Sequence, residues 1–260
     1  MFVRISTIFI LALVIGIFIN STYAEIKSDT IVGIWLMDGG KGDTVEDSSG
    51  NGHDGKFIGN DIKWADGKFE KALEFPGVGG NRVDIPHEDS LTLAEWTITA
   101  WAKQKPTGGA WAVVLVKDPA NGIQNYALDM NGDGLVFSEV TAGGNWSDCG
   151  SVTKVYDEEW HFLAASYDGK NLHVYVDGKH EKEQAFAKAD DNTAPVTIGD
   201  RLDGSQPING IIDDVGLFSV ALSEKDINDI MTKGLGTATG VAPVNSLGKL
   251  AFTWGMIKTR

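Results

Sequence analysis

Residues 160–179, WHFLAASYDGKNLHVYVDGK, give the clearest indication of the fold of this chain. From Leu172 to Asp177, aliphatic side chains alternate with polar or aromatic ones, which is the period of two expected of a β-strand with one buried face. The arm before it is equally strand-like, and Asp168-Gly169 between the arms suits the positive φ angles of a tight turn. Asp177-Gly178 offers a second turn. The stretch predicts an antiparallel hairpin, which needs a larger sheet to bury its apolar face.

Short strand-like segments lie on both sides of this hairpin and are separated by turns rich in Gly and Asn. They are residues 31–37, 71–75, 82–85, 96–103, 111–117, 124–130, 135–140, 196–199 and 210–218. Roughly a dozen short strands without a long helical period predict an all-β protein, a sandwich of two antiparallel sheets.

The C-terminal part contains one predicted helix. Ser223 is a suitable N-cap for a short helix over residues 224–231, and Gly234 is a stop signal. Residues 236–260 read as a linker rich in small residues, followed by an apolar tail with a basic end. The tail is too short and interrupted to cross a membrane, and we expect it to dock on the domain as an added strand.

The composition excludes some classes of function. The formal net charge is −14, from 36 acidic and 22 basic residues, whereas a nucleic-acid-binding face needs clustered Lys and Arg. Acidic turns are suited to hold divalent cations, although the alternative is that the charge only keeps a secreted protein soluble. The single cysteine, Cys149, excludes an internal disulfide and is expected to be an inert thiol.

The N-terminus resembles a secretory signal peptide. Arg4 precedes an apolar run over residues 8–19, and Thr22-Tyr23-Ala24 supplies the small residues that a signal peptidase requires. We expect residues 1–24 to be removed, so that the mature chain is extracellular, at the cell surface or periplasmic. An uncleaved anchor is the alternative, but the apolar run is shorter than the about 20 residues that span a bilayer.

Several separated motifs carry a family resemblance. They are Gly33 to Asp38, Val45 to Gly55, Trp96 to Trp101, the hairpin of residues 160–179, Gly210 to Val215, and Leu217 to Leu222 with the helix after it. In this order they are similar to the laminin-G-like domains of the concanavalin A-like lectin/glucanase superfamily, in particular the bacterial secreted type. The resemblance implies a two-sheet jelly-roll over residues 25–235, commonly with one bound calcium and a binding role.

The expected calcium site joins the two ends of this domain. The resemblance implies that Asp38 and Asp213 are ligands and that carbonyl groups near Gly52 and His53 complete the site. Ca²⁺ takes oxygen ligands, so the acidic, Gly-rich loop of residues 38–55 has a suitable composition, and Asp47 and Asn51 are further candidates. The alternative for these last two residues is that they only bond turn amides. A pair of aspartates, 213 and 214, inside a buried-strand pattern also favours a cation.

Sugar binding needs exposed aromatic rings that stack against pyranose faces. Trp146, in a loop predicted over residues 143–148, is the first candidate, and Trp111 and Tyr126 are the next. The alternative is that these rings are core, as we expect for the tryptophans within strand patterns. Residues 129–134 match the start of an EF-hand loop, but the glutamate needed at its twelfth place is absent, so a hairpin turn is expected.

Enzymatic signatures are missing from the sequence. No strand carries the Glu-x-Asp-x-x-Glu pattern of the superfamily's glucanases, and there is no Gly-x-Ser-x-Gly motif. The five histidines show no pairwise metal spacing, and His173 is expected on the surface of its sheet. We therefore predict a non-catalytic secreted module that binds a glycan or glycoconjugate. A structural or adhesion module that contacts a cell-surface protein is the alternative, and a glycan-active hydrolase or lyase comes third.

Overall fold

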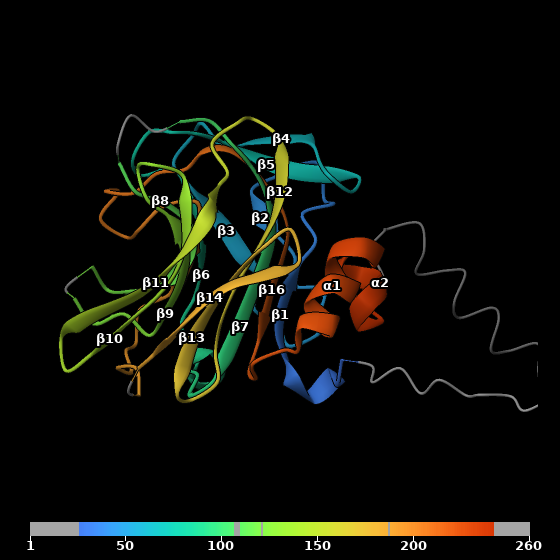
Figure 1. Ribbon diagram of the computed structural model, residues 1–260. Helices are drawn as coiled ribbons and strands as arrows, with labels where there is room; N and C mark the ends of the chain where they lie inside the picture. Colours follow the sequence, from blue (N-terminus) through green and yellow to red (C-terminus); the bar gives the residue numbers. More distant parts are fainter. Residues whose placement is uncertain (1–25, 107–109, 121, 187, 242–260) are drawn as a thin grey trace, which may run out of the picture.

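The computed structural model describes residues 26–241 except 107–109, 121 and 187. Within them the chain forms a sandwich of two eight-stranded sheets, and all strand pairs are antiparallel (Figure 1). The predicted fold class, an all-β jelly-roll sandwich, is confirmed. The predicted signal peptide and most of the tail lie outside the described residues.

Sheet A has the order β14-β13-β12-β7-β16-β5-β4, and β1 also pairs with β16. Its strands are β1 (Ile31–Trp35), β4 (Lys63–Asp66), β5 (Lys71–Pro76), β7 (Trp96–Gln104), β12 (Trp160–Tyr167), β13 (Asn171–Val176), β14 (Lys179–Ala185) and β16 (Asn209–Phe218). Sheet B has the order β11-β10-β9-β8-β15-β6-β3-β2. Its strands are β2 (Thr44–Val45), β3 (Gly55–Ile58), β6 (Arg82–Ile85), β8 (Ala112–Lys117), β9 (Tyr126–Met130), β10 (Leu135–Ala142), β11 (Asn145–Lys154) and β15 (Val196–Ile198).

The main core lies between the two sheets. It contains the inward-facing residues of both sheets, among them Trp35, Trp96, Leu128 and Val174. A second apolar cluster lies on the outer side of sheet A, where Trp101 and Phe162 pack with residues of helix α1 (Glu224–Lys233). Because the helical segment covers this side, sheet A is buried on both faces along its middle strands (Figure 1).

The two ends of the described chain both pack in this second cluster. Ile26 is buried in it and Val241 packs against it. Both ends therefore lie on the helical side of the sandwich, away from the β8–β11 side of sheet B (Figure 1).

Residues 235–239 correct the predicted linker. They form a short helix, α2 (Leu235–Thr239), in which the Leu235 side chain is buried. The physical reason is that Leu235 adds apolar area to the second core, and burial of such a side chain outweighs the weak helix propensity of Gly and Thr. Two single-turn 3₁₀ helices, Ser28–Thr30 and Asp89–Leu91, complete the elements.

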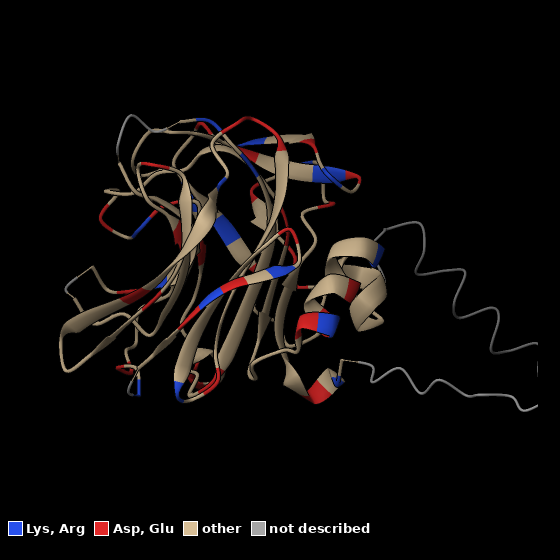
Figure 2. Cartoon of the chain, in the orientation of Figure 1, with Lys and Arg blue, Asp and Glu red and all other residues tan. Residues whose placement is uncertain are grey.

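Two surface properties bear on function. In the view of Figure 2, acidic and basic residues are interspersed over both sheets and the helices, without an extended basic area. Over the described residues, none of the helices has the length and apolar character needed to cross a membrane.

Candidate metal centre and binding face

The register of β1 against β16 brings an aspartate from each end of the domain together. Trp35 pairs with Val215 in this antiparallel ladder, so the chain leaving β1 carries Asp38 toward Asp213 and Asp214. Asp38 and Asp214 line one cavity, and Asp213 directly precedes Asp214 in β16, so the three carboxyl groups lie in one region. We call them the Asp38 cluster.

A β-bulge explains why two consecutive residues of β16 both leave the main core. The pairing of β16 with β7 shifts between Asp213 and Gly216, and Asp214 adopts a left-handed φ of 49°. Ile212 and Val215, on either side, both point into the main core. The extra residue thus places the Asp213 and Asp214 side chains together, outside the main core, although neighbours on a regular strand point to opposite faces.

Burial and like charge raise the pKa values of the carboxyl groups in this cluster. Burial, reinforced by the neighbouring carboxylates, raises the pKa of Asp213 to about 8 and that of Asp214 to about 7. Burial, together with nearby Glu70, raises the pKa of Asp38 to about 6. Near neutral pH the cluster favours either bound protons or a bound cation, because adjacent buried negative charges repel one another.

Hydrogen bonds from the protein reach only some of the carboxylate oxygens in this cluster. The Phe69 amide donates to Asp213 Oδ2 (2.9 Å) and the Leu235 amide donates to Asp214 Oδ2 (3.0 Å). Asp213 Oδ1 is buried, and no described residue bonds it. Asp38 and Asp214 line a cavity of about 430 Å³ beside α2. Converging carboxylates with a free buried oxygen and access to solvent fit a hard cation such as Ca²⁺.

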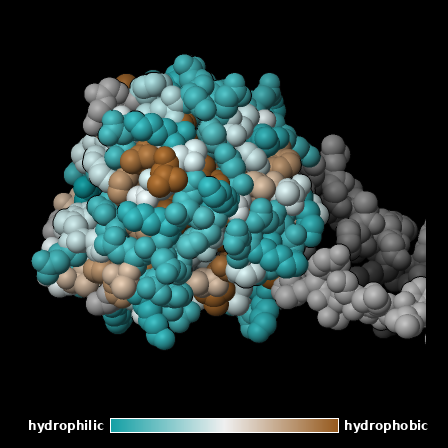
Figure 3. Space-filling model, in the orientation of Figure 1, coloured by the Kyte–Doolittle hydropathy of each residue, from teal (hydrophilic) through white to brown (hydrophobic). Residues whose placement is uncertain are grey.

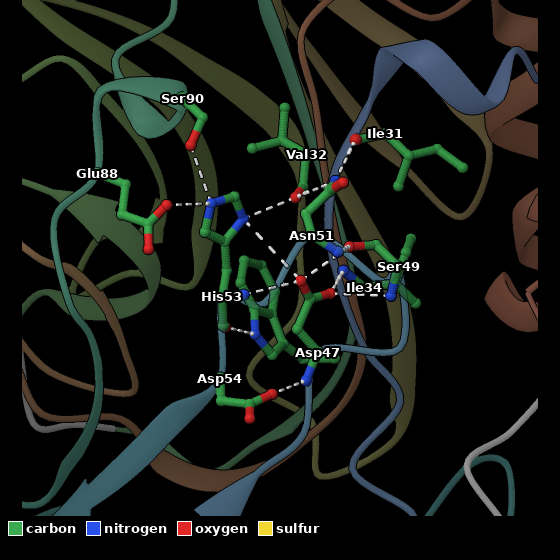
Figure 4. Close-up of polar contacts among 11 residues, drawn as sticks. Ile31, Val32, Ile34, Asp47, Ser49, Asn51, His53, Asp54, Glu88 and Ser90 are labelled. Atoms are coloured by element: carbon green, nitrogen blue, oxygen red, sulfur yellow. Dashed lines mark hydrogen bonds and ion pairs between the residues drawn. The ribbon is translucent and has the colours of Figure 1, made fainter.

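The other predicted metal ligands belong to a separate network around Asp47 (Figure 4). Asp47 Oδ1 accepts from the amides of Ile34 and Ser49, both at 2.9 Å. Its Oδ2 accepts from the Ser49 hydroxyl (2.8 Å) and the His53 amide (3.0 Å). The carboxylate is buried, and these four donors compensate its charge. Asp47 therefore orders the turn-rich loop through hydrogen bonds of the protein itself.

Asn51 and His53 tie the same loop to β1. The Asn51 amide donates to the carbonyls of Ile31 and Val32, and His53 Nδ1 lies 2.9 Å from the Val32 carbonyl. The His53 carbonyl accepts from the Trp35 indole (2.8 Å). Within the described residues, no hydrogen bond or ion pair joins this network to the Asp38 cluster.

These contacts favour the turn-amide alternative for part of the predicted ligand set. The turn-amide interpretation holds for Asp47, and Asn51 and His53 serve as links between loop and strand. Gly52 provides a turn with φ of 87°. Asp214, which the sequence pattern had marked only as the partner of Asp213, instead joins Asp38 and Asp213. The sequence could not show this, because it depends on the bulge in β16.

The three aromatic candidates have different environments. Tyr126 is fully buried in the main core, where its hydroxyl donates to the Leu91 carbonyl, so its prediction as a ligand-contacting ring is wrong. Trp146 is 51% exposed and lies on strand β11, which replaces the predicted loop. Trp111, directly before β8, is partly exposed and packs against Phe137, with ring centroids 5.0 Å apart.

Trp146 lies on the outer face of β8–β11. Residues of these strands that point inward, such as Leu128 and Val136, belong to the main core, and the alternate positions form the outer face. Thr141 is the cross-strand partner of Trp146, and Phe137 pairs with Gly150. Trp146 and Gly150 are four residues apart on β11, so Trp146 and the Phe137–Trp111 pair are separated by about 13 Å. We call this surface the Trp146 face.

Polar groups lie between the two aromatic positions. The Arg201 guanidinium is 5.9 Å from the centre of the Trp146 ring and forms an ion pair with buried Asp118. Glu139 lies across from Asp148 on β11, and Asp129 on β9 is its diagonal neighbour. Burial raises the pKa of both Asp129 and Glu139, that of Glu139 to about 7. A carboxyl group that holds its proton can both donate and accept a hydrogen bond.

Sequence reasoning missed these polar residues. The sequence predicts only a hairpin turn over residues 129–134. The structure confirms this turn for residues 131–134 and places Asp129 in β9. Arg201 lies in a loop far along the chain. The space-filling view shows the surroundings: a compact hydrophobic area over β8 and β11 within a largely hydrophilic surface (Figure 3). Val152 of β11, 70% exposed, is among the exposed large hydrophobic residues.

Comparisons with known proteins agree with this architecture. The binding domain of Paraclostridial Mosquitocidal Protein 1 superimposes with a TM-score of 0.65 at 15% identity, over 79% of this chain and 52% of that one. Domain 4 of AbnA, a GH43 extracellular arabinanase from Geobacillus stearothermophilus solved with arabinotriose, gives 0.61 at 21% identity, over 78% and 98%. The binding domain of Botulinum neurotoxin DC in complex with rat synaptotagmin II gives 0.62 at 13% identity, over 79% and 52%.

Sequence comparison finds a longer relative and a family. The chain is 27% identical over 177 residues to Adhesion G-protein coupled receptor V1 of Danio rerio, covering 61% of this chain and 3% of the receptor. It thus spans a small part of that receptor and about half of the first matched binding domain. A laminin G family model, described as concanavalin A-like lectin/glucanases superfamily, matches residues 77–228. The chain belongs to the concanavalin A-like lectin/glucanase superfamily.

Proposed function

We propose that this protein is a non-catalytic binding module that recognises carbohydrate on the Trp146 face. The observation that carries this proposal is the half-exposed Trp146 ring beside the Arg201 guanidinium, on a face that also presents the Phe137–Trp111 pair. Aromatic rings stack against sugar rings, while nearby polar groups fix the hydroxyls. The separation of the two aromatic positions suits an oligosaccharide better than a single sugar. The complex of AbnA domain 4 with arabinotriose supports this class of ligand.

Support for a non-catalytic role comes from the burial of the Asp129–Glu139 pair. Retaining glycosidases hold two carboxyl groups about 5 Å apart, so that one can attack while the other donates a proton. Asp129 and Glu139 are instead diagonal neighbours on β9 and β10, and both are almost fully buried. This buried pair suits a hydrogen-bonding floor for a ligand.

Calcium has a structural role in this proposal. Asp38, Asp213 and Asp214 would hold the ion, and the ion would join the chain after β1 to the middle of β16 and to the start of α2. Support comes from the unpartnered Asp213 Oδ1 and from the mutual repulsion of the three carboxylates. Bound calcium would neutralise this repulsion. The protein would be exported, in agreement with the predicted signal peptide.

The test of the carbohydrate proposal compares two single substitutions. Glycan-array and titration measurements, with arabinotriose among the probes, should show binding for the wild type and a loss of up to about tenfold for Trp146→Ala, since aromatic stacking contributes about 0.5–1.5 kcal/mol. Ile58→Ala is the matched control, because Ile58 is a 37% exposed apolar residue on β3, near the opposite edge of sheet B. Glycan binding that survives Trp146→Ala would contradict the assignment of this face.

A module that contacts a cell-surface protein is the second candidate. The relative is an adhesion receptor, and the neurotoxin domain is complexed with a protein, synaptotagmin II. Exposed Val152 close to the Trp146 face would suit such a contact. Two results would favour this second candidate: no binding on the glycan array, and capture of a surface protein that the Trp146→Ala variant no longer binds.

A further inference from the structure

A cluster of two histidines and a glutamate lies on sheet A, apart from both sites described above. His173 Nδ1 is 3.2 Å from His180 Nε2 and 3.8 Å from Glu183 Oε2. The three possible ligand atoms all lie within 4.8 Å of one another. His173 and His180 are partly buried, while Glu183 is exposed. We call these residues the His173 cluster.

A second β-bulge brings the cluster onto one face. His173 pairs directly with Glu183, and Tyr175 pairs with His180, but the register shifts between Val174 and Tyr175. His180 and Glu183 are three residues apart, so in a regular strand they would point to opposite faces. The bulge inserts one extra residue, Glu181, and returns both side chains to the face that carries His173.

The inserted residue is fixed by contacts to the other sheet. The Glu181 carboxylate accepts hydrogen bonds from the amides of Val152 (2.8 Å) and Thr153 (2.9 Å) and from the Thr153 hydroxyl (2.6 Å). These bonds lower the pKa of Glu181 in spite of the opposing effect of burial. Glu181 therefore points toward β11, and the bulge that aligns the cluster is locked in place.

Asp168 prepares His173 for a ligand. Asp168 Oδ2 lies 3.5 Å from His173 Nε2, and its Oδ1 accepts from the amides of Lys170 and Asn171. A carboxylate beside Nε2 favours the tautomer with its proton on that nitrogen, which leaves the lone pair on Nδ1 directed at His180 and Glu183. Carboxylates behind metal-bound histidines have this role in many proteins.

From these observations we propose that His173 Nδ1, His180 Nε2 and the Glu183 carboxylate bind a first-row transition-metal ion, for which Zn²⁺ is the probe. Two nitrogens bound to one Zn²⁺ at about 2.05 Å in a tetrahedral site lie about 3.3 Å apart, close to the separation of the two histidine nitrogens. Imidazole ligands prefer Zn²⁺, Cu²⁺ or Ni²⁺ to Ca²⁺. Three protein ligands leave one position for water or for a group of a partner molecule.

The competing interpretation is a plain hydrogen bond in which His180 Nε2–H donates to His173 Nδ1. Such a bond requires neither Glu183 nor Asp168, whereas a metal site depends on both. Titration calorimetry of the full chain with Zn²⁺ in millimolar Ca²⁺ should show one site, and Co²⁺ should give the visible absorption of tetrahedral coordination. Saturating Ca²⁺ would occupy the carboxylate-rich Asp38 cluster, so that Zn²⁺ binding there does not contribute to the measured heat.

The variants separate the two interpretations. His180→Gln should abolish the site, while Glu183→Gln and Asp168→Asn should each weaken Zn²⁺ binding by about 10- to 100-fold. His87→Gln is the matched control, because His87 Nδ1 lies 3.0 Å from the Lys117 ammonium and should not attract a cation. Circular dichroism of the metal-free variants checks that each is folded. Absence of Zn²⁺ binding by the wild type, or unchanged binding by folded His180→Gln, would overturn the proposal, and neither result bears on the Trp146 face.

Discussion

The two buried aspartates Asp47 and Asp213 differ in how many hydrogen bonds the protein donates to their carboxylates. Asp47 accepts four hydrogen bonds and lies 3.9 Å from the His53 ring, so its charge is fully compensated. Asp213 accepts a bond from the Phe69 amide on one oxygen, while its other oxygen is bare and a second aspartate follows it in the chain. Both residues are buried aspartates, but only Asp47 accepts hydrogen bonds on both of its oxygens.

Removal of the Asp47 carboxylate should destabilise the domain strongly. Asp47→Ala leaves buried amides of Ile34 and His53 without acceptors, so we expect a loss of about 3 kcal/mol in the free energy of unfolding. Urea unfolding, monitored by tryptophan fluorescence, measures the change. Asp54→Ala is the control: exposed Asp54 accepts one bond in this network, from the Asp47 amide, and its removal should cost about 1 kcal/mol. Equal stability of Asp47→Ala and the wild type would show that the loop is ordered by something else.

At the scale of elements, strands with a strong apolar pattern could be predicted and strands ordered by their neighbours could not. The opening hairpin appears as β12 and β13 with the predicted turns, because its alternation and Asp-Gly pairs act locally. The sequence does not predict strands β11 and β14: β11 begins with Asn-Trp-Ser-Asp, and β14 is almost entirely polar. Each pairs with the strand directly before it, β10 or β13, and this pairing stabilises it although its own polar sequence shows no apolar alternation.

In the candidate sites, too, some residues could be placed from the sequence and others could not. The meeting of Asp38 with Asp213 was expected from the family resemblance, and the register of β1 on β16 produces it. The inclusion of Asp214 and the alignment of His180 with Glu183 both result from bulges, each of which changes the face that a side chain points to. A period-of-two reading cannot place such residues, because it assumes an unbroken register.

The packing of helix α2 should affect both the stability of the domain and calcium binding at the Asp38 cluster. Leu235 is fully buried, and its amide holds Asp214, so Leu235→Ala removes core contacts at the place where this carboxylate is positioned. We expect a loss of about 3 kcal/mol in unfolding free energy and a smaller rise of melting temperature on addition of Ca²⁺. Thr237→Ala, at an exposed position of the same helix, should leave both quantities unchanged. An unaltered calcium response in Leu235→Ala would separate α2 from the metal site.

For the molecule as a whole, the Asp38 cluster predicts an unusual dependence of stability on pH. In the unfolded chain these carboxyl groups ionise near pH 4, whereas in the metal-free fold their pKa values are about 6, 8 and 7. The native state therefore binds more protons than the unfolded state between these limits. Unfolding free energy from this cluster is greatest below pH 4 and is lost as the pH rises to about 8.

Calcium should reverse this loss. In EDTA the melting temperature should fall between pH 5 and pH 8, and saturating Ca²⁺ should remove much of the fall, because the ion replaces the protons. Asp213→Asn should flatten the profile in EDTA and abolish the calcium effect. Differential scanning calorimetry over this range provides the measurement. Identical melting curves with EDTA and with Ca²⁺ at pH 8 would rule out the proposed ion.

Ile26 and Val241 both pack in the second core, and this has a mechanical consequence. A tether attached at either end of the described domain would pull on the helical side of the sandwich (Figure 1). A domain held from that side would present its opposite side outward, with Trp146 directed away from the attachment.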